Sequence, residues 1–264
     1  MTPRSGIAAS LVDRARDDAA RAAAAAGVEV VAVTDGDVSG VQDVLAGVWG
    51  DQQRIQANLL MAMSHAGATV GAAVRDGRAV GACVGFLGWT GGVHLHSHMA
   101  AVRPGVRAGG IGYALKLWQR GVCLAHGVDE IRWTFDPLVR RNAYFNLAKL
   151  GARVVDYRPD FYGEMDDIVN AGDHSDRFEV SWALASADVT AALRGLAEVP
   201  DRRDPVVPLP EDYDRLRQED PGAARRWRER TRAALAEHWA AGRRPIWAGT
   251  GYAFRPVDAG RAGW

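Results

Sequence analysis

The sequence predicts a mixed α/β fold in which a sheet carries helices on both faces. Segments with helical periodicity alternate with short β-branched runs along most of the 264 residues. An Asp-Gly pair at 76–77 separates two apolar runs, which is a strong local signal for a hairpin. Hydrophobic residues make up 48% of the chain, enough for a core of ordinary size.

The first half of the chain is expected to alternate helices and strands. An alanine-rich helix over 1–27 should end at Gly27, because glycine accepts the left-handed conformation of a helix C-terminus. Pro104 limits a strand at 94–102, since proline lacks a backbone N–H. Between them we expect a strand at 28–33, a helix from Asp37 to about Trp49, a helical pattern at 54–65, and strands at 69–75 and 78–87.

The middle of the chain continues this alternation. Apolar residues recur at helical spacing over 109–126, so this segment predicts an amphipathic helix. The elements expected after it are a strand at 130–135, a short helix at 142–150, a strand at 152–157, an acidic loop at 160–176 and a strand at 178–185.

The composition changes after about residue 199. Residues 199–213 hold four of the eleven prolines and resemble a linker. An arginine-rich helical stretch at 211–241 and one or two short strands at 245–254 follow. We therefore expect an N-terminal helix at 1–27, a core domain at 28–185 and a C-terminal appendage at 186–264.

Charge and apolar content exclude several classes of protein. The chain has 32 basic and 32 acidic residues, which argues against nucleic acid and membrane surfaces as partners. No apolar run approaches the about 20 residues of a membrane span, and the N-terminus has no signal-peptide core. Cys83 and Cys123 lie in apolar segments, as expected for buried thiols. These features predict a cytoplasmic protein.

A glycine-rich turn follows the strand at 94–102. Its residues run Arg107-Ala108-Gly109-Gly110-Ile111-Gly112, and a helix begins directly after them. Glycines let the backbone approach a ligand, and the helix start offers unpaired N–H groups and the positive end of the helix dipole. No Gly-Lys-Ser/Thr follows, and Leu115 occupies the third glycine position of a dinucleotide fingerprint. The turn therefore predicts a pyrophosphate site of another kind.

The segment around this turn resembles the acyl-CoA-binding segment of the GNAT (Gcn5-related N-acetyltransferase) superfamily. That pattern is a strand, Val-x-Pro, Gln/Arg-x-x-Gly-x-Gly/Ala and a helix. The α/β order from about 28 to 158 is similar too, and SHMAAV, WTFDPLVRRNAYFNLAKLGA and the Phe161–Gly163 loop resemble a bacterial branch of predicted acetyltransferases with unassigned substrate. The pattern is filled by Val102, Pro104, Arg107, Gly110 and Gly112.

The resemblance implies a mostly antiparallel sheet with splayed central strands in the 28–185 core. It implies transfer of an acyl group from acetyl-CoA or another acyl-CoA to an amine of a small-molecule acceptor, by direct attack. No metal is expected as a cofactor. The residues implied to bind CoA are Ala100, Ala101 and Val102 for the pantetheine, and Arg107, Ala108, Gly109, Gly110, Ile111 and Gly112 for the pyrophosphate.

The sequence departs from the superfamily on its second cofactor helix. The common pattern is Asn-x-x-Ala-x-x-x-Tyr-x-x-x-Gly, in which the tyrosine protonates the CoA thiolate. Aligned on Gly151, the tyrosine position is Leu147 and the asparagine position is Arg140. We expect Tyr144 to be the substitute acid, with core packing as its alternative role, and Asn142 to be the substitute cofactor-binding residue.

Leu147 also keeps two alternative functions open. The protein would then bind acyl-CoA without turnover, or take its acyl group from a carrier protein in specialised metabolism. A monomer and a homodimer are both compatible with the sequence.

Three histidines alternate along the strand at 94–102. His94, His96 and His98 should share one face, but they span about 13 Å, so at most two neighbours would hold one metal ion. We expect His94 to be solvated near a sheet edge and His96 to be a satisfied core residue. His98 lies near the implied splay, and we predict that it is the catalytic base or a proton relay.

Two further segments carry candidate residues. Asp136 ends its strand before a proline, and we predict a catalytic carboxylate there, with a plain strand-end turn as the alternative. Tyr162 and Glu164 in the loop FYGEMDD are predicted to bind a cationic acceptor, with a solvated acidic loop as the alternative. Asp176 and Arg177 should form an ion pair that orders this loop.

The last helix is expected to have one apolar face and one solvated basic face. The apolar face should hold Trp227, Thr231, Leu235 and His238, and the basic face should hold Arg225, Arg226, Arg228 and Arg230.

Overall fold

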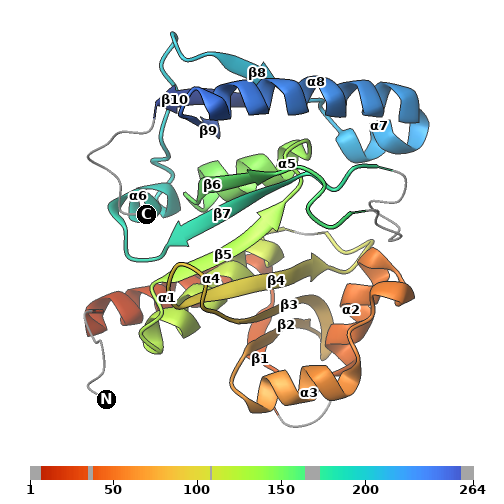
Figure 1. The fold of residues 1–264 in the computed structure, drawn as a ribbon. Coiled ribbons are helices and arrows are strands. Elements are labelled where there is room, and N and C mark those ends of the chain that lie inside the picture. Colours follow the sequence, from red (N-terminus) through yellow and green to blue (C-terminus); the bar gives the residue numbers. More distant parts are fainter. Residues whose placement is uncertain (1–6, 35–37, 108, 164–172, 257–264) are drawn as a thin grey trace. The chain divides into compact units, whose positions relative to one another are not determined.

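A computed structural model describes residues 7–34, 38–107, 109–163 and 173–256. The described chain separates into two compact units that divide between Trp133 and Thr134 (Figure 1). Its main sheet has the strand order β1-β2-β3-β4-β5-β7-β6. The pairs β1–β2, β2–β3, β3–β4 and β6–β7 are antiparallel, and the pair β4–β5 is parallel. The structure thus confirms a mixed, mostly antiparallel α/β fold. No helix in the described part of the chain is both long and apolar enough to cross a membrane.

The first unit contains the predicted hairpin and the predicted N-terminal helix. Asp76 and Gly77 have φ angles of 51° and 72°, as a two-residue type I′ turn requires. Gly27, at φ 63°, ends the first helix. The elements are α1 (Ala9–Ala26), β1 (Glu29–Ala32), α2 (Ser39–Trp49), a 3₁₀ turn (Asp51–Gln53), α3 (Ala57–His65), β2 (Thr69–Arg75), β3 (Arg78–Gly88), β4 (His94–Val102), α4 (Ile111–Ala125) and the start of β5 (Glu130–Phe135).

Two helix starts differ from the sequence prediction. The helical pattern at 54–65 forms a helix only from Ala57, because a 3₁₀ turn precedes it. The expected cap Asp37 lies outside the described residues, and α2 begins at Ser39.

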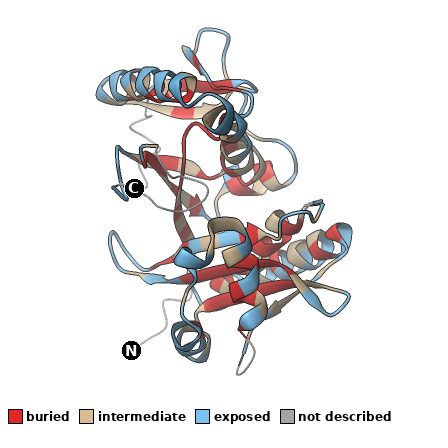
Figure 2. Ribbon diagram, turned by 90° about the vertical axis from the view of Figure 1, so that its right-hand side faces the viewer, coloured by how far each residue is buried: buried red, intermediate tan, exposed pale blue. Residues whose placement is uncertain are grey.

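Helices cover both faces of the first unit's strands, as predicted. Successive strand residues point to opposite faces, so Ala72 packs with α2 and α3 while Ala73 packs with α1 and α4. Leu45 and Leu60 fill the first interface, and Ile111 and Leu115 fill the second. Figure 2 shows the buried residues concentrated along the strands. This double cover fixes the position of β4, on which the candidate site is built.

The second unit includes elements that the sequence did not predict. Helix α6 is short and is capped by Ser186, whose hydroxyl accepts from the Val189 N–H. Strand β8 lies in the proline-rich stretch expected to be a linker. The elements are α5 (Arg140–Ala143), a π-helical turn (Tyr144–Lys149), β6 (Arg153–Arg158), β7 (Arg177–Ala183), α6 (Ala187–Leu193), β8 (Val206–Pro208), α7 (Tyr213–Glu219), α8 (Pro221–Ala240), β9 (Arg243–Trp247) and β10 (Gly251–Pro256).

An aromatic cluster forms the core of the second unit. The fully buried ring of Phe178 packs edge-on against Phe135, Tyr157 and Tyr252, at centroid distances of 5.8, 5.7 and 5.3 Å. The Tyr252 hydroxyl donates to the Pro137 carbonyl at 2.7 Å. Residues of the C-terminal sheet β8-β10-β9 therefore share a core with β7.

Candidate functional site

Strands β4 and β5 diverge soon after they meet. They pair only at Leu95 with Ile131 and at His96 with Arg132. Along residues 97–102, β3 occupies one edge of β4, and the other edge has no strand partner in the described part of the first unit. The splay implied by the sequence resemblance is therefore present. An unpaired edge offers backbone N–H and C=O groups to an extended ligand.

A β-bulge lies at the start of the open segment. Ser97 pairs with Gly85 and Met99 pairs with Val84, so His98 has no partner on β3. A bulge leaves one residue outside the ladder and redirects its side chain. The imidazole of His98 is exposed as a result, beside the open edge of β4.

The three histidines share one face, as predicted. The rings of His96 and His98 lie 5.2 and 5.9 Å from the ring of Phe86. His94 differs from the expectation of a solvated residue, because it is only 6% exposed. Its ring occupies the space that a side chain at Gly88 would need. In the described residues no group of three metal-ligating side chains gathers.

The environment of these rings favours neutral imidazoles. Burial, together with the nearby charges of His98, His94 and Lys116, lowers the pKa of His96 to about 4. Partial desolvation also lowers the pKa of His98. His98 is therefore uncharged at neutral pH and able to accept a proton.

The glycine-rich turn has two glycines with positive φ directly before α4. Gly109 and Gly110 have φ angles of 37° and 99°, and Gly110 is the N-cap of α4. A Cβ added at Gly112 would meet nothing within 4 Å, so the first turn of the helix is open. Arg107 is exposed, while Ile111 is fully buried and anchors the start of the helix. The turn thus presents helix N–H groups to solvent with no acidic residue in the first turn.

A buried polar chain crosses the first unit, and sequence reasoning missed it. The Lys116 ammonium donates to Ser97 Oγ at 2.8 Å, and Ser97 Oγ donates to Gln119 Oε1 at 2.9 Å. Gln119 Nε2 then donates to Thr69 Oγ1 at 3.1 Å. Its sequence signal is the rarity of lysine, which supplies two of the 32 basic residues. The chain joins α4 to the first residue of the open segment of β4.

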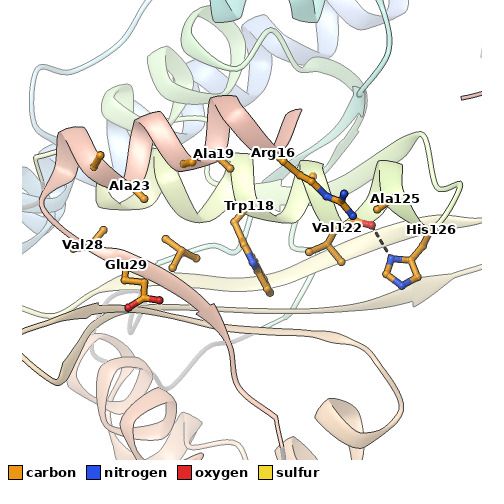
Figure 3. A pocket seen from close by; sticks show the side chains of 13 residues that line it. Arg16, Ala19, Ala23, Val28, Glu29, Trp118, Val122, Ala125 and His126 are labelled. Carbon is orange, nitrogen blue, oxygen red and sulfur yellow. Dashed lines mark hydrogen bonds between the residues drawn. The ribbon is translucent and has the colours of Figure 1, made fainter. Parts of the chain in front are cut away.

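A separate groove of about 540 Å³ lies between α1, β1 and α4. Its walls are mostly alanine, valine and glycine, with Trp118 on one side (Figure 3). Arg16 and His126 lie at one end and Glu29 lies at the other (Figure 3). None of the predicted cofactor residues lines this groove, so it is distinct from the candidate site.

The second cofactor helix of the resemblance corresponds to α5 and the π-helical turn. Leu147, at the usual tyrosine position, is buried. Tyr144 is 51% exposed, and its ring packs edge-on against Trp247 at 6.1 Å. Asn142 lies on α5 and is partly buried. The expected single helix is therefore an α-turn followed by a π-turn. Because a π-turn has more residues per turn, the side chains after it point in other directions than on a continuous α-helix.

Asp136 is occupied by an ion pair. Its carboxylate accepts from Arg228 Nη1 at 2.9 Å and Nη2 at 2.6 Å, and from the Leu138 N–H at 2.8 Å. Arg228 is 1% exposed, which corrects the expectation that it lies on a solvated basic face. Because both oxygens of Asp136 are engaged, we assign no proton transfer to it. The buried face of α8 consists of Ala224, Arg228, Thr231 and Leu235.

Arg228 also binds Asp173. Its Nη2 donates to Asp173 Oδ2 at 2.7 Å, and the Tyr213 hydroxyl donates to the same oxygen at 2.8 Å. Burial raises the pKa of Asp173, but the hydrogen bonds from Arg228 and Tyr213 and the charge of Arg228 outweigh it, so the pKa is lowered. Burial likewise opposes the charge of Arg228, and Asp136 and Asp173 raise its pKa. Arg228 thus holds two carboxylates in one buried network.

A second cluster surrounds the side chain of Asp176, which was expected to pair with Arg177. The Asp176 carboxylate accepts from Arg232 Nε at 3.0 Å and from the Tyr157 hydroxyl at 2.9 Å. Arg177 Nη1 donates to the Asp176 backbone carbonyl at 2.9 Å and lies 3.9 Å from Asp136 Oδ2. Arg232 also donates to Asp160, at 3.1 Å. Residues of α8 therefore hold both described ends of the 160–176 loop.

The predicted acceptor residue Tyr162 lies within this held segment. Its hydroxyl is 3.1 Å from Thr134 Oγ1, and its backbone N–H donates to Ser175 Oγ at 3.0 Å. The Arg177 guanidinium lies 5.4 Å from its ring centre. Two other predicted residues, Ala108 and Glu164, lie outside the described residues.

Comparisons with known proteins identify similar folds. No protein-family model matches the sequence, and a search of curated proteins found no match. A GNAT family acetyltransferase from Elizabethkingia anophelis with acetyl-CoA bound is 16% identical, over 60% of this chain and 98% of that chain, with a TM-score of 0.47. The ribosomal-protein-S18-alanine N-acetyltransferase from Escherichia coli is 12% identical, over 61% of this chain and 96% of that chain, with a TM-score of 0.48. An N-acetyltransferase from Staphylococcus aureus Mu50 is 10% identical, over 60% of this chain and 98% of that chain, with a TM-score of 0.49. All three are acetyltransferases by name, and the first is named for the superfamily that the sequence resembles.

Proposed function

We propose that this chain is a GNAT-superfamily acyltransferase, which moves an acyl group from acyl-CoA to an amine of a small-molecule acceptor. The observation that carries the proposal is the combination of an open β4 edge and a glycine turn at the start of α4. Both lie on the first unit, and the chain between them is only a few residues long. The sequence resemblance assigns the edge to pantetheine and the turn to pyrophosphate.

The proposed reaction needs a proton acceptor and an acyl carbonyl held in place. The acceptor's ammonium loses a proton to His98 or to a water beside it, and the free amine then attacks the thioester carbon. In this proposal, backbone N–H groups of the open β4 segment donate to the oxygen that gains charge. Collapse of the intermediate breaks the C–S bond, and the CoA thiolate takes up the second proton released by the attacking nitrogen, directly or through water.

Calorimetry with CoA, acetyl-CoA and longer acyl-CoAs tests the cofactor assignment. We expect binding of CoA and its thioesters, followed by thiol release when a panel of amines is added. Absence of any CoA binding would overturn the proposal. Binding without thiol release across the panel would instead favour an acyl-CoA-binding protein, the alternative that buried Leu147 supports.

Replacing His98 by alanine is expected to lower kcat about 100-fold or more, the usual contribution of a general base. The pKa of His98 lies below its ordinary value, so the wild-type rate should fall as the pH drops through that lowered pKa. The variant should lack this acid limb. A pH profile of kcat/KM measures both effects, with His126→Ala, an exposed histidine on the same unit, as the control. An unchanged profile in His98→Ala would remove the assignment.

A further inference from the structure

Lys116 is a buried cation in a chain whose basic residues are almost all arginines. Two of its 32 basic residues are lysines, and Lys116 is only 5% exposed. Burying an ammonium without a counter-charge costs several kcal/mol. Lysine tolerates such a position because it can lose its proton, whereas arginine stays charged. A lysine at this position can therefore be neutral in one state of the protein and charged in another.

No counter-ion for Lys116 lies among the described residues that surround it. The titratable groups close enough to interact electrostatically with Lys116 are Cys83 on β3, Cys123 on α4 and His96 on β4. Burial raises the pKa of both thiols to about 12, so neither cysteine is negative near neutral pH. Burial also lowers the pKa of Lys116 itself to about 7.

The ammonium lies at the point where β4 and β5 separate. It donates to Ser97 on β4 and lies 3.8 Å from the ring centre of Trp133 on β5. Ser97 and Trp133 each directly follow the last β4–β5 pair, His96 with Arg132. Lys116 is therefore at the closed end of the splay. It is carried by α4, the helix that begins at the glycine turn.

We propose that Lys116 selects the acyl group and favours donors whose acyl chain ends in a carboxylate, such as malonyl-CoA or succinyl-CoA. This proposal rests on the proposed function, in which the thioester lies in the splay. An ammonium has three N–H donors, and the described contacts use one oxygen acceptor and one aromatic face. A terminal carboxylate on the acyl chain supplies the missing charge and further acceptors.

The pairing makes donor binding depend on pH. A carboxylate beside Lys116 favours its protonated form, so binding of such a donor raises the pKa of Lys116 above the value of about 7 in the free protein. Below pH 7 the lysine is already charged and binding is strongest. Above pH 7 the binding must also take up a proton, so affinity falls by up to about tenfold per pH unit.

Calorimetry at pH 6.5 with succinyl-CoA and butyryl-CoA, which share a four-carbon acyl chain, tests the inference. We expect the wild type to bind succinyl-CoA at least about tenfold more tightly, and Lys116→Met to lose or reverse this preference while binding unacylated CoA as before. Lys149→Met, which removes the only other lysine, is the matched control and should keep the preference. Lys116→Met should unfold at the same or a higher temperature, because it removes an uncompensated buried charge.

The outcomes separate this inference from the proposed function. Equal affinity of the wild type for the two donors, or a preference that survives in Lys116→Met, overturns the role of Lys116 and leaves acyl-CoA binding intact. Failure of the wild type to bind CoA and both thioesters overturns the proposed function itself. A pH series on the wild type gives a test without any variant, since the succinyl preference should fade between pH 7 and 9, and a constant preference contradicts the inference.

Discussion

Replacing Gly112 by glutamate is expected to weaken binding of CoA and its thioesters by about 100-fold or more without loss of stability. The backbone at Gly112 is helical, and a Cβ there meets nothing within 4 Å, so the side chain fits without strain. A carboxylate in the first turn of α4 also stabilises the helix, by about 0.3–1 kcal/mol, because it faces the positive end of the dipole. The same charge repels a pyrophosphate bound at that position.

Gly112→Gln is the matched control for this substitution, since it adds nearly the same volume without the charge. We expect calorimetry to show a small loss of CoA affinity in Gly112→Gln and a large loss in Gly112→Glu. Thermal unfolding should show that both variants are folded. Equal CoA affinity in the wild type and both variants would mean that the pyrophosphate binds elsewhere.

Replacing Arg228 by methionine is expected to destabilise the second unit by about 3–5 kcal/mol. Its guanidinium makes four of the hydrogen bonds received by Asp136 and Asp173, and both carboxylates are nearly inaccessible to solvent. Removing one partner of a buried ion pair leaves the other charge without solvent or a partner, and that is the costly case. Urea unfolding, followed by tryptophan fluorescence and circular dichroism, measures the change.

Arg225→Met on the same helix is the control, because Arg225 is exposed and should change stability by about 0.5 kcal/mol or less. Adding Asp136→Asn to Arg228→Met should recover part of the loss, because it removes one of the two orphaned charges. A small effect of Arg228→Met, similar to that of Arg225→Met, would show that the network contributes little to the folded state.

Local signals predicted the parts of the fold that depend on a few neighbouring residues. The Asp76-Gly77 turn and the stop at Gly27 follow from backbone preferences that the two glycines satisfy on their own. The bulge at His98 was not predictable, because its position is set by how β4 pairs with β3 and by nothing within β4 alone. The same holds for the π-helical turn at 144–149, whose sequence is that of an ordinary helix.

The glycine turn at 107–112 stays a predicted site, and the prediction rests on its residue types and spacing. The buried charges were not predictable from the sequence. Arg228 and Lys116 each stand in a helix, and charged residues in helices are mostly exposed. The partner of Arg228 is 92 residues away in the sequence. A weaker signal was present, because Arg228 falls on the same helical face as Ala224, Thr231 and Leu235.

The burial of Lys116 has a consequence for the chemical durability of the protein. Acyl thioesters modify free amines without any enzyme, and a protein that gathers them near its own surface exposes its lysines to that damage. Arginine keeps its proton and is a poor nucleophile, so the 30 arginines of this chain are protected by their own basicity. One of its two lysines is withdrawn from solvent. The chain thereby exposes few amines to spontaneous acylation in solution, although the proposed site brings an acyl group to Lys116 itself.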